Sequence, residues 1–110
     1  MTEQWRKIKG FPAYSVSSLG RVRNDETGRI LKPFPRSFNN LYLGVDLCRG
    51  GSRYPRRVHR LVAQAFIPNP DYKREVNHLD CDPRNNSVEN HEWCTREENE
   101  AHKRFMEIAV

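Results

Sequence analysis

Asparagine and histidine side chains are concentrated in the last third of the chain, where they could bind a cation and accept a proton. Five of the nine asparagines lie between residues 77 and 99, and three of the four histidines lie between residues 78 and 102. A neutral imidazole, with an ordinary pKa of about 6.5, can take a proton from water near pH 7. Amide oxygens are suitable ligands for hard divalent cations. Residues of these types could form a hydrolytic site if the fold brings them together.

A strand, a loop, a second strand and a helix would place these side chains side by side. Residues 75–78 and 90–94 are predicted to form the two strands. Asn77 and His78 then close the first strand, and Asn99 stands one turn into the helix that follows. His102 lies three residues after Asn99, so the two side chains are neighbours on the helix surface. Either they contribute to the site, or they simply face water.

The start of this last helix carries the best local signal in the chain. Thr95 is followed three residues later by Glu98, which is the spacing of a capping box. The apolar residues of the helix are expected to form a buried stripe: Ala101, Phe105 and Ile108. In the preceding loop, Asn85 and Asn86 are interpreted as loop-forming residues, because asparagine closes Asx turns and tolerates left-handed backbone.

The first two thirds of the chain read as an antiparallel sheet module with one helix. Alternating or short apolar segments separated by turn residues predict strands at residues 13–17, 21–24, 29–32, 41–47 and 54–58. Residues 59–67 then place four apolar side chains at helical spacing, and two prolines at positions 68 and 70 end this helix. The predicted fold class is therefore α+β.

The charge is divided between these two parts. Residues 1–70 hold 13 Lys and Arg against four Asp and Glu, a net charge of +9, whereas residues 71–110 hold six against ten, a net charge of −4. A basic part can neutralise phosphates, which favours a polyanionic partner. An acidic part would repel the same partner unless a cation lay between them. Two solvated faces of one domain are the alternative interpretation.

Composition excludes several classes of protein. No stretch approaches the roughly 18 consecutive apolar residues of a membrane span. The three cysteines are odd in number and form no C-x-x-C pair, which argues against a disulfide framework and against a structural zinc site. The first residues show neither an apolar run nor a cleavage site for export. We therefore expect a cytoplasmic protein that is not secreted and has no membrane partner.

Two segments resemble known families. The segments V-N-H-L-D (76–80), N-N-S-V-E-N-H-E-W-C-T (85–95) and E-N-E-A-H (98–102) look like an HNH endonuclease of the phage and intron-homing type, also called a His-Me finger nuclease. The similarity runs from about Val58 to His102. Ahead of it, the segments I-K-G-F (8–11), Y-S-V-S (14–17) and G-R-V (20–22) resemble the nuclease-associated modular domain of the fourth type.

The resemblance implies a division of the chain and a chemistry. It implies a basic DNA-binding module in residues 1–52 and a nuclease domain in residues 53–110, with a ββα-metal finger at about 75–108. One divalent cation, Mg²⁺ or Mn²⁺, would stabilise the 3′-oxygen leaving group while His78 activates the attacking water. Asn77 would be one metal ligand. Asn99 would be the second, although His102 also fits a ligand position by spacing.

The resemblance also assigns tasks to two further residues and to a partner. Asn90, the middle letter of the motif, would fix the loop and help to orient His78 through hydrogen bonds. Asn77 stands where many members carry Asp, so metal affinity is expected to be weaker or to need the phosphate. Double-stranded DNA is the implied partner, and a monomer or weak homodimer is expected, because one finger cuts one strand. The rival hypothesis is a DNA-binding module of weak or no activity that kept the scaffold.

Basic residues around residues 49–57 are the expected DNA contacts. Four arginines fall within these nine residues, on a predicted hairpin with an Arg-Gly-Gly-Ser turn. Arg53 or Arg56 would reach base edges while the other arginines contact the backbone. The full set of expected DNA contacts is Arg49, Arg53, Arg56, Arg57, His59 and Arg60. For His59, at the junction of strand and helix, a purely structural role is the alternative.

Overall fold

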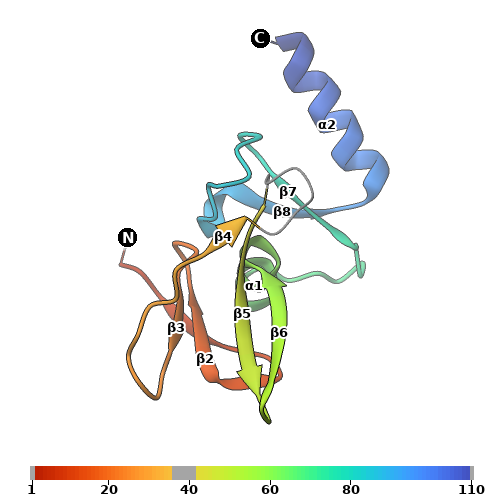
Figure 1. Cartoon of the computed structure of the whole chain (residues 1–110). Coiled ribbons are helices and arrows are strands. Elements are labelled where there is room, and N and C mark those ends of the chain that lie inside the picture. Colours follow the sequence, from red (N-terminus) through yellow and green to blue (C-terminus); the bar gives the residue numbers. More distant parts are fainter. Residues whose placement is uncertain (1, 36–41, 110) are drawn as a thin grey trace.

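A computed structural model describes residues 2–35 and 42–109 of the chain, and side chains as far as residue 106. The elements (Figure 1) follow in this order: β1 (Trp5–Ile8), β2 (Phe11–Ser17), β3 (Val22–Asn24), β4 (Phe34–Pro35), β5 (Leu43–Arg49), β6 (Ser52–Arg57), α1 (Val58–Phe66), β7 (Glu75–His78), a 3₁₀ turn η1 (Val88–Asn90), β8 (His91–Cys94) and α2 (Arg96–Ala109). The predicted α+β class is confirmed. Among the described residues, none of the helices is long and apolar enough to cross a membrane.

Three antiparallel sheets are arranged around α1. Two of them have three strands, in the orders β1-β2-β3 and β4-β5-β6, and the third is the β7–β8 hairpin. Helix α1 contacts strands of all three sheets. It forms because its apolar residues recur at helical spacing, and Leu61, Val62 and Ala63 are almost fully buried. This short helix is therefore the common support of the molecule.

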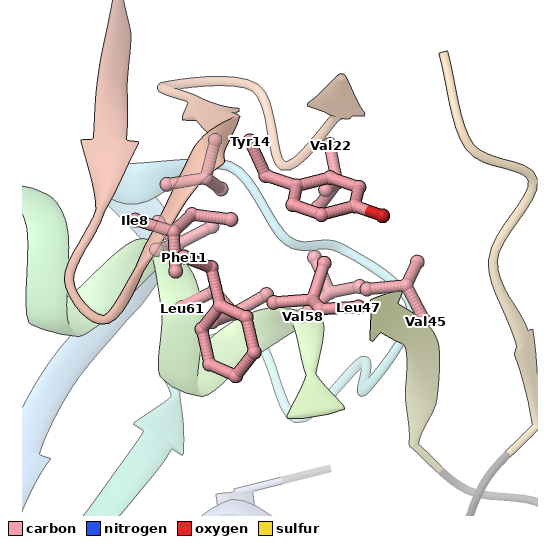
Figure 2. Close-up of a cluster of buried hydrophobic side chains, with 10 residues drawn as sticks. Ile8, Phe11, Tyr14, Val22, Val45, Leu47, Val58 and Leu61 are labelled. Atoms are coloured by element: carbon pink, nitrogen blue, oxygen red, sulfur yellow. The ribbon is translucent and has the colours of Figure 1, made fainter. Parts of the chain in front are cut away.

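One hydrophobic core joins the first and second sheets to α1. Figure 2 shows side chains from β1, β2 and β3 meeting those of β5 and α1. The most completely buried members are Val16, Val22, Val45, Leu47, Val58 and Val62. The predicted division between residues 52 and 53 falls at the start of β6, inside the β5–β6 hairpin. The two segments therefore share their core.

Two local expectations about secondary structure and burial are wrong. Residues 29–32 do not form a strand: Ile30 makes only an isolated bridge to Arg23, because the chain turns away towards the two prolines at 33 and 35. On α2, Ala101 is exposed and Phe105 is 65% exposed, so the expected buried stripe is absent from this part of the helix. The reason is visible in Figure 1, where α2 extends away from the body beyond its first turns. The side chain of Ile108 lies outside the described residues.

Candidate functional site

The β7–β8 hairpin presents different side chains on its two faces. Consecutive side chains of a strand point to opposite faces, and the register pairs Asn77 with Glu92 and His78 with His91. Asn77 and Glu92 therefore lie on one face, with Glu75, and this face meets α2 through a hydrogen bond from Asn99. His78 and His91 lie on the other face, beside α1. The site is built on both sides of the end of one hairpin.

Two buried asparagine amides meet the α2 face of this hairpin. Asn77 donates from Nδ2 to Oε1 of Glu92 over 3.3 Å, and Asn99 donates from Nδ2 to Oε1 of Glu75 over 2.9 Å. Each carboxylate accepts from the amide nitrogen, which fixes the orientation of the amide. The Oδ1 atom of Asn99 is buried and has no hydrogen-bond partner. A buried acceptor of this kind costs free energy unless a ligand satisfies it.

The electrostatics of this face favour a cation. Burial, together with the nearby carboxylates of Glu75, Glu92 and Glu98, raises the pKa of the Cys94 thiol to about 11. Glu75 and Glu92 would attract a positive ion, whereas Glu98 is already paired with Lys73. No group of three His, Cys, Asp or Glu side chains among the described residues could hold a metal ion. The buried Oδ1 of Asn99, which has no hydrogen-bond partner, is an oxygen that a hard divalent cation could use as a ligand.

The His78 ring is hydrogen-bonded to Asn86, which was expected only to shape the loop. The imidazole is 6% exposed, and its Nε2 lies 3.0 Å from Oδ1 of Asn86. Its ring meets that of His91 edge to face, with 4.7 Å between centroids, and lies 5.1 Å from that of His59. Asn86 is itself buried. The sequence gives no local signal for this contact, because an asparagine that binds a histidine cannot be told from one that only shapes a loop.

Asn90 fixes the loop, and its hydrogen bonds do not reach His78. Its Oδ1 accepts from the backbone N–H of Asp80 over 3.0 Å, and its Nδ2 donates to Oδ1 of Asp80 over 2.9 Å and to the carbonyl of Asn85 over 3.0 Å. The side chain that contacts the His78 ring is Asn86, so an orienting effect of Asn90 on His78 would act through the backbone of the loop.

His59 does not lie with the arginines that it was grouped with. It is buried on α1, stacked on Tyr42 with 4.9 Å between ring centroids, and close to His78. Burial, together with the neighbouring His78 and His91, lowers its pKa to about 3. Burial likewise lowers the pKa of His91 to about 4. Both imidazoles are therefore neutral at pH 7, and the burial of His59 favours the structural role over a phosphate contact.

These two histidines should make stability fall between pH 7 and pH 5. In the unfolded chain their pKa is near 6.5, so the unfolded state takes up protons in this range while the native state does not. The free energy of unfolding should drop by about 2 kcal/mol for each histidine. The paired carboxylates of Glu3 and Asp25, whose pKa values are lowered to about 2, protonate in the unfolded chain only at lower pH.

Urea unfolding at pH 7, 6 and 5 measures this drop. The variant His59→Gln should show a smaller drop than the wild type, because one of the two titrating groups is gone. His102→Gln is the control, since His102 is only partly buried. A free energy of unfolding that is the same at pH 7 and pH 5 would contradict the account.

His102 is occupied by a backbone contact. Its Nε2 lies 3.0 Å from the carbonyl oxygen of Leu79, so the ring donates Nε2–H to that carbonyl.

The start of α2 is fixed by the predicted capping box, which is confirmed: Glu98 N–H donates to Oγ1 of Thr95 over 3.1 Å, and Thr95 N–H donates to Oε1 of Glu98 over 2.9 Å. The box sets the position of Asn99, the next residue.

The arginines of the β5–β6 ribbon are divided between its two faces. Arg53 and Arg57 lie on the outward face, in register with Cys48 and Gly44. Arg56 lies on the opposite face, where its guanidinium is 5.2 Å from the ring of Phe11. Residues three apart in a strand point to opposite faces. Arg53 and Arg56 therefore cannot both contact the same DNA groove from one face of the ribbon.

Three of the expected DNA contacts, including Arg57 of the outward face, have intramolecular contacts of their own. Arg49 donates from Nη1 to the carbonyl of Gly10 over 2.7 Å and lies over the Phe11 ring. Arg60 donates from Nη1 to the carbonyl of Arg74 over 2.7 Å. Arg57 lies over the ring of Tyr42, at 5.2 Å. Arg53 and Arg57 are the two arginines that share the outward face of β6.

Comparison with known families agrees with this geometry. Residues 3–48 match the family model described as NUMOD4 motif, and residues 56–101 match the model described as HNH endonuclease. The chain thus carries a NUMOD4 motif followed by an HNH endonuclease segment, as the sequence resemblance implied. The boundary between the two matches includes the β5–β6 hairpin turn.

Particular relatives support the same assignment. Two uncharacterized HNH endonucleases of Acanthamoeba polyphaga mimivirus are 36% and 37% identical over 102 and 106 residues, which are 93% and 92% of this chain. DNA endonuclease I-HmuI of Bacillus phage SP01 is 34% identical over 98 residues, 87% of this chain. The chain spans 30%, 26% and 55% of the lengths of these relatives.

A solved structure shows the same fold. The structure titled DNA binding and cleavage by the HNH homing endonuclease I-HmuI matches with a TM-score of 0.85 and 31% identity, over 94% of this chain and 59% of that chain. The likeness therefore includes both the NUMOD4 segment and the HNH segment.

Proposed function

We propose that this protein is a metal-dependent DNA endonuclease that hydrolyses phosphodiester bonds. The observation that carries the proposal is the pair of buried amides, Asn77 and Asn99, that the hairpin and α2 bring to one acidic face, with His78 at the end of the same strand. The matches to HNH endonucleases and the likeness to I-HmuI support it. In this account DNA is the substrate.

The amide oxygens of Asn77 and Asn99 would hold one divalent cation, Mg²⁺ or Mn²⁺. Glu92 and Glu75 would orient the two amides by accepting from their nitrogens. Such a cation, when bound, stabilises negative charge that develops on the leaving oxygen. Asn99 rather than His102 is the second ligand in this proposal, because the Oδ1 of Asn99 is buried and has no hydrogen-bond partner.

His78 would act as the general base. Its Nε2 faces Asn86, so Nδ1 is the ring atom left to accept a proton from water. The water oxygen attacks phosphorus, the bond from phosphorus to the 3′ oxygen breaks, and that oxygen is protonated from solvent. The products are a 3′-hydroxyl and a 5′-phosphate. Asn90 contributes by fixing the loop that follows His78.

Arg53 and Arg57 would supply phosphate contacts from the outward face of β6. We expect the double variant Arg53→Ala/Arg57→Ala to lower the slope of log K against log salt for duplex DNA by about 2, because each lost phosphate contact removes about 0.9. Arg56→Ala is the matched control, since Arg56 packs on the opposite face. Fluorescence anisotropy at several salt concentrations measures the slope. Equal slopes for the wild type and the double variant would contradict the assignment.

We further propose how the chain is organised in use. Residues 1–52 would act chiefly in DNA binding and residues 53–110 in cleavage. A monomer has one finger and would cut one strand, so a double-strand break would need two copies or two events. The protein would work in the cytoplasm, on DNA that is present there.

Plasmid nicking followed by ligation tests the proposed function. Supercoiled plasmid incubated with the protein and Mg²⁺ should yield open circles before linear molecules, and DNA ligase should reseal those circles, because the nick carries a 3′-hydroxyl and a 5′-phosphate. Plasmid that stays supercoiled while the protein still binds it would instead support a DNA-binding module without activity. Open circles that ligase cannot seal would contradict the proposed bond cleavage.

A further inference from the structure

We propose that Asn86 fixes the tautomer of His78, and that Gly20 of the NUMOD4 segment positions Asn86, so that the N-terminal segment completes the nuclease site. This inference deepens the proposed function and rests on it for its catalytic meaning. Asn86 and Gly20 are positioning residues in this account, because neither would contact the DNA or the metal ion to act.

The contact between Asn86 and His78 permits one assignment of the ring protons. Oδ1 of Asn86 is only an acceptor, so His78 Nε2 must carry the hydrogen of the 3.0 Å contact. The neutral ring then has its lone pair on Nδ1. Both side chains are buried, which shields this hydrogen bond from competing water. Without Asn86, the ring would lose the one hydrogen bond that defines its orientation among the described contacts.

The position of Asn86 is set by the turn between β2 and β3. A Cβ atom placed on Gly20 would lie 2.6 Å from both the Cβ and the carbonyl oxygen of Asn86 and 2.9 Å from its carbonyl carbon. Such distances are far below normal contact, and two of the three atoms belong to backbone that cannot rotate away. Only glycine allows this turn to approach the loop so closely. Gly20 also has φ +84°, which favours glycine.

A backbone hydrogen bond joins the same two segments. Val88 donates its N–H to the carbonyl of Ser18 over 2.8 Å, two residues from Asn86 and two from Gly20. The turn at 17–21 therefore holds the loop at 86–88 by a hydrogen bond and by close contact. A displacement of about 1 Å in a catalytic group can cost about 100-fold in rate. The turn thus acts on catalysis through Asn86 and His78.

The variants Asn86→Ala and Asn86→Asp test whether Asn86 fixes the tautomer of His78. Asparagine replaced by aspartate keeps an acceptor oxygen, whereas alanine removes it. In ¹⁵N NMR spectra at neutral pH the wild type and Asn86→Asp should show His78 protonated at Nε2, with a slowly exchanging ring N–H. In Asn86→Ala that N–H resonance should be lost to exchange, and kcat for plasmid nicking should fall about 10- to 100-fold with KM nearly unchanged. His78 protonated at Nδ1 in the wild type would overturn the assignment.

Gly20→Ala tests whether Gly20 positions Asn86, and Gly28→Ala is the matched control. Gly28 also has positive φ, +76°, but a Cβ there would meet nothing within 4 Å. Both substitutions therefore carry the same backbone strain, and only Gly20→Ala pushes against Asn86. Gly20→Ala should broaden or shift the His78 Nε2–H signal and lower kcat, while Gly28→Ala should leave both as in the wild type. Identical spectra and rates for the two variants would overturn the coupling.

The NMR measurement separates this inference from the proposed function. If the protein does not cleave DNA, the His78 ring signals still report whether Asn86 and Gly20 control the imidazole. If it does cleave and Asn86→Ala leaves both kcat and the ring N–H signal unchanged, the positioning role is wrong although the nuclease assignment stands. Thermal unfolding of each variant shows whether Gly20→Ala is folded, and the Asn86 pair tests the same link without altering the turn.

Discussion

Replacing His78 with alanine is expected to lower the rate of Mg²⁺-dependent DNA cleavage by about 10²- to 10⁴-fold, the usual contribution of a general base. The imidazole is the side chain at the end of β7 that can accept a proton, and Asn86 holds its Nε2. DNA binding should change little, because the ring is buried and is not expected to contact a phosphate. Initial rates of plasmid nicking at saturating Mg²⁺ measure the effect.

The control for this prediction is another histidine of the same cluster. His91→Gln removes an imidazole that packs against His78, so it should cost stability and have a smaller effect on rate at temperatures where the protein is folded. Circular dichroism of each variant confirms that it is folded. His78→Ala protein that is folded, binds DNA and nicks plasmid at the wild-type rate would show that the general base lies elsewhere.

Asn99→Ala is expected to have the second large effect, and His102→Ala a small one. The Oδ1 atom of Asn99 is buried without a hydrogen-bond partner, and its Nδ2 donates to the Glu75 carboxylate, whereas His102 lies against a backbone carbonyl. Loss of a metal ligand should cost at least the roughly 10- to 100-fold that loss of an outer-shell partner costs. Asn99→Ala should therefore bind Mn²⁺ at least 10-fold more weakly.

Mn²⁺ titration monitored by electron paramagnetic resonance compares the two variants without relying on activity. His102→Ala should keep wild-type Mn²⁺ affinity, with a modest loss of stability from the missing contact to Leu79. The opposite order, with weakened binding in His102→Ala and normal binding in Asn99→Ala, would move the second ligand to His102. Nicking rates at increasing Mg²⁺ concentration should follow the same order as the affinities.

Local rules were sufficient for much of the fold. Alternation of apolar and polar side chains located β2 and β5, helical spacing located α1, and the Thr95–Glu98 capping box located the start of α2. Each of these depends on interactions within a few residues. The failures at residues 29–32 and on the exposed face of α2 are long-range in origin, because neither the path of the chain after Gly28 nor the absence of a covering element is encoded locally.

The site was predictable in its residue types and less so in its pairings. Asn77, His78 and Asn99 stood out because their spacing fits a hairpin and a helix, and the roles expected of them came from the family resemblance. The partners of Asn77 and Asn99 could have been suspected from strand periodicity, since Glu75 and Asn77 are two apart and share a face. The role of Asn86 depends on the approach of Gly20 from another segment, which no spacing rule contains.

The most direct test of the central claim is the initial rate of plasmid nicking by wild-type protein and His78→Ala, each measured in Mg²⁺ and in EDTA. Open circles should form only with wild-type protein in Mg²⁺, and adding Mg²⁺ in excess to the EDTA reaction should restore the rate. Equal nicking in EDTA would contradict the metal requirement. Equal nicking by folded His78→Ala would contradict the base.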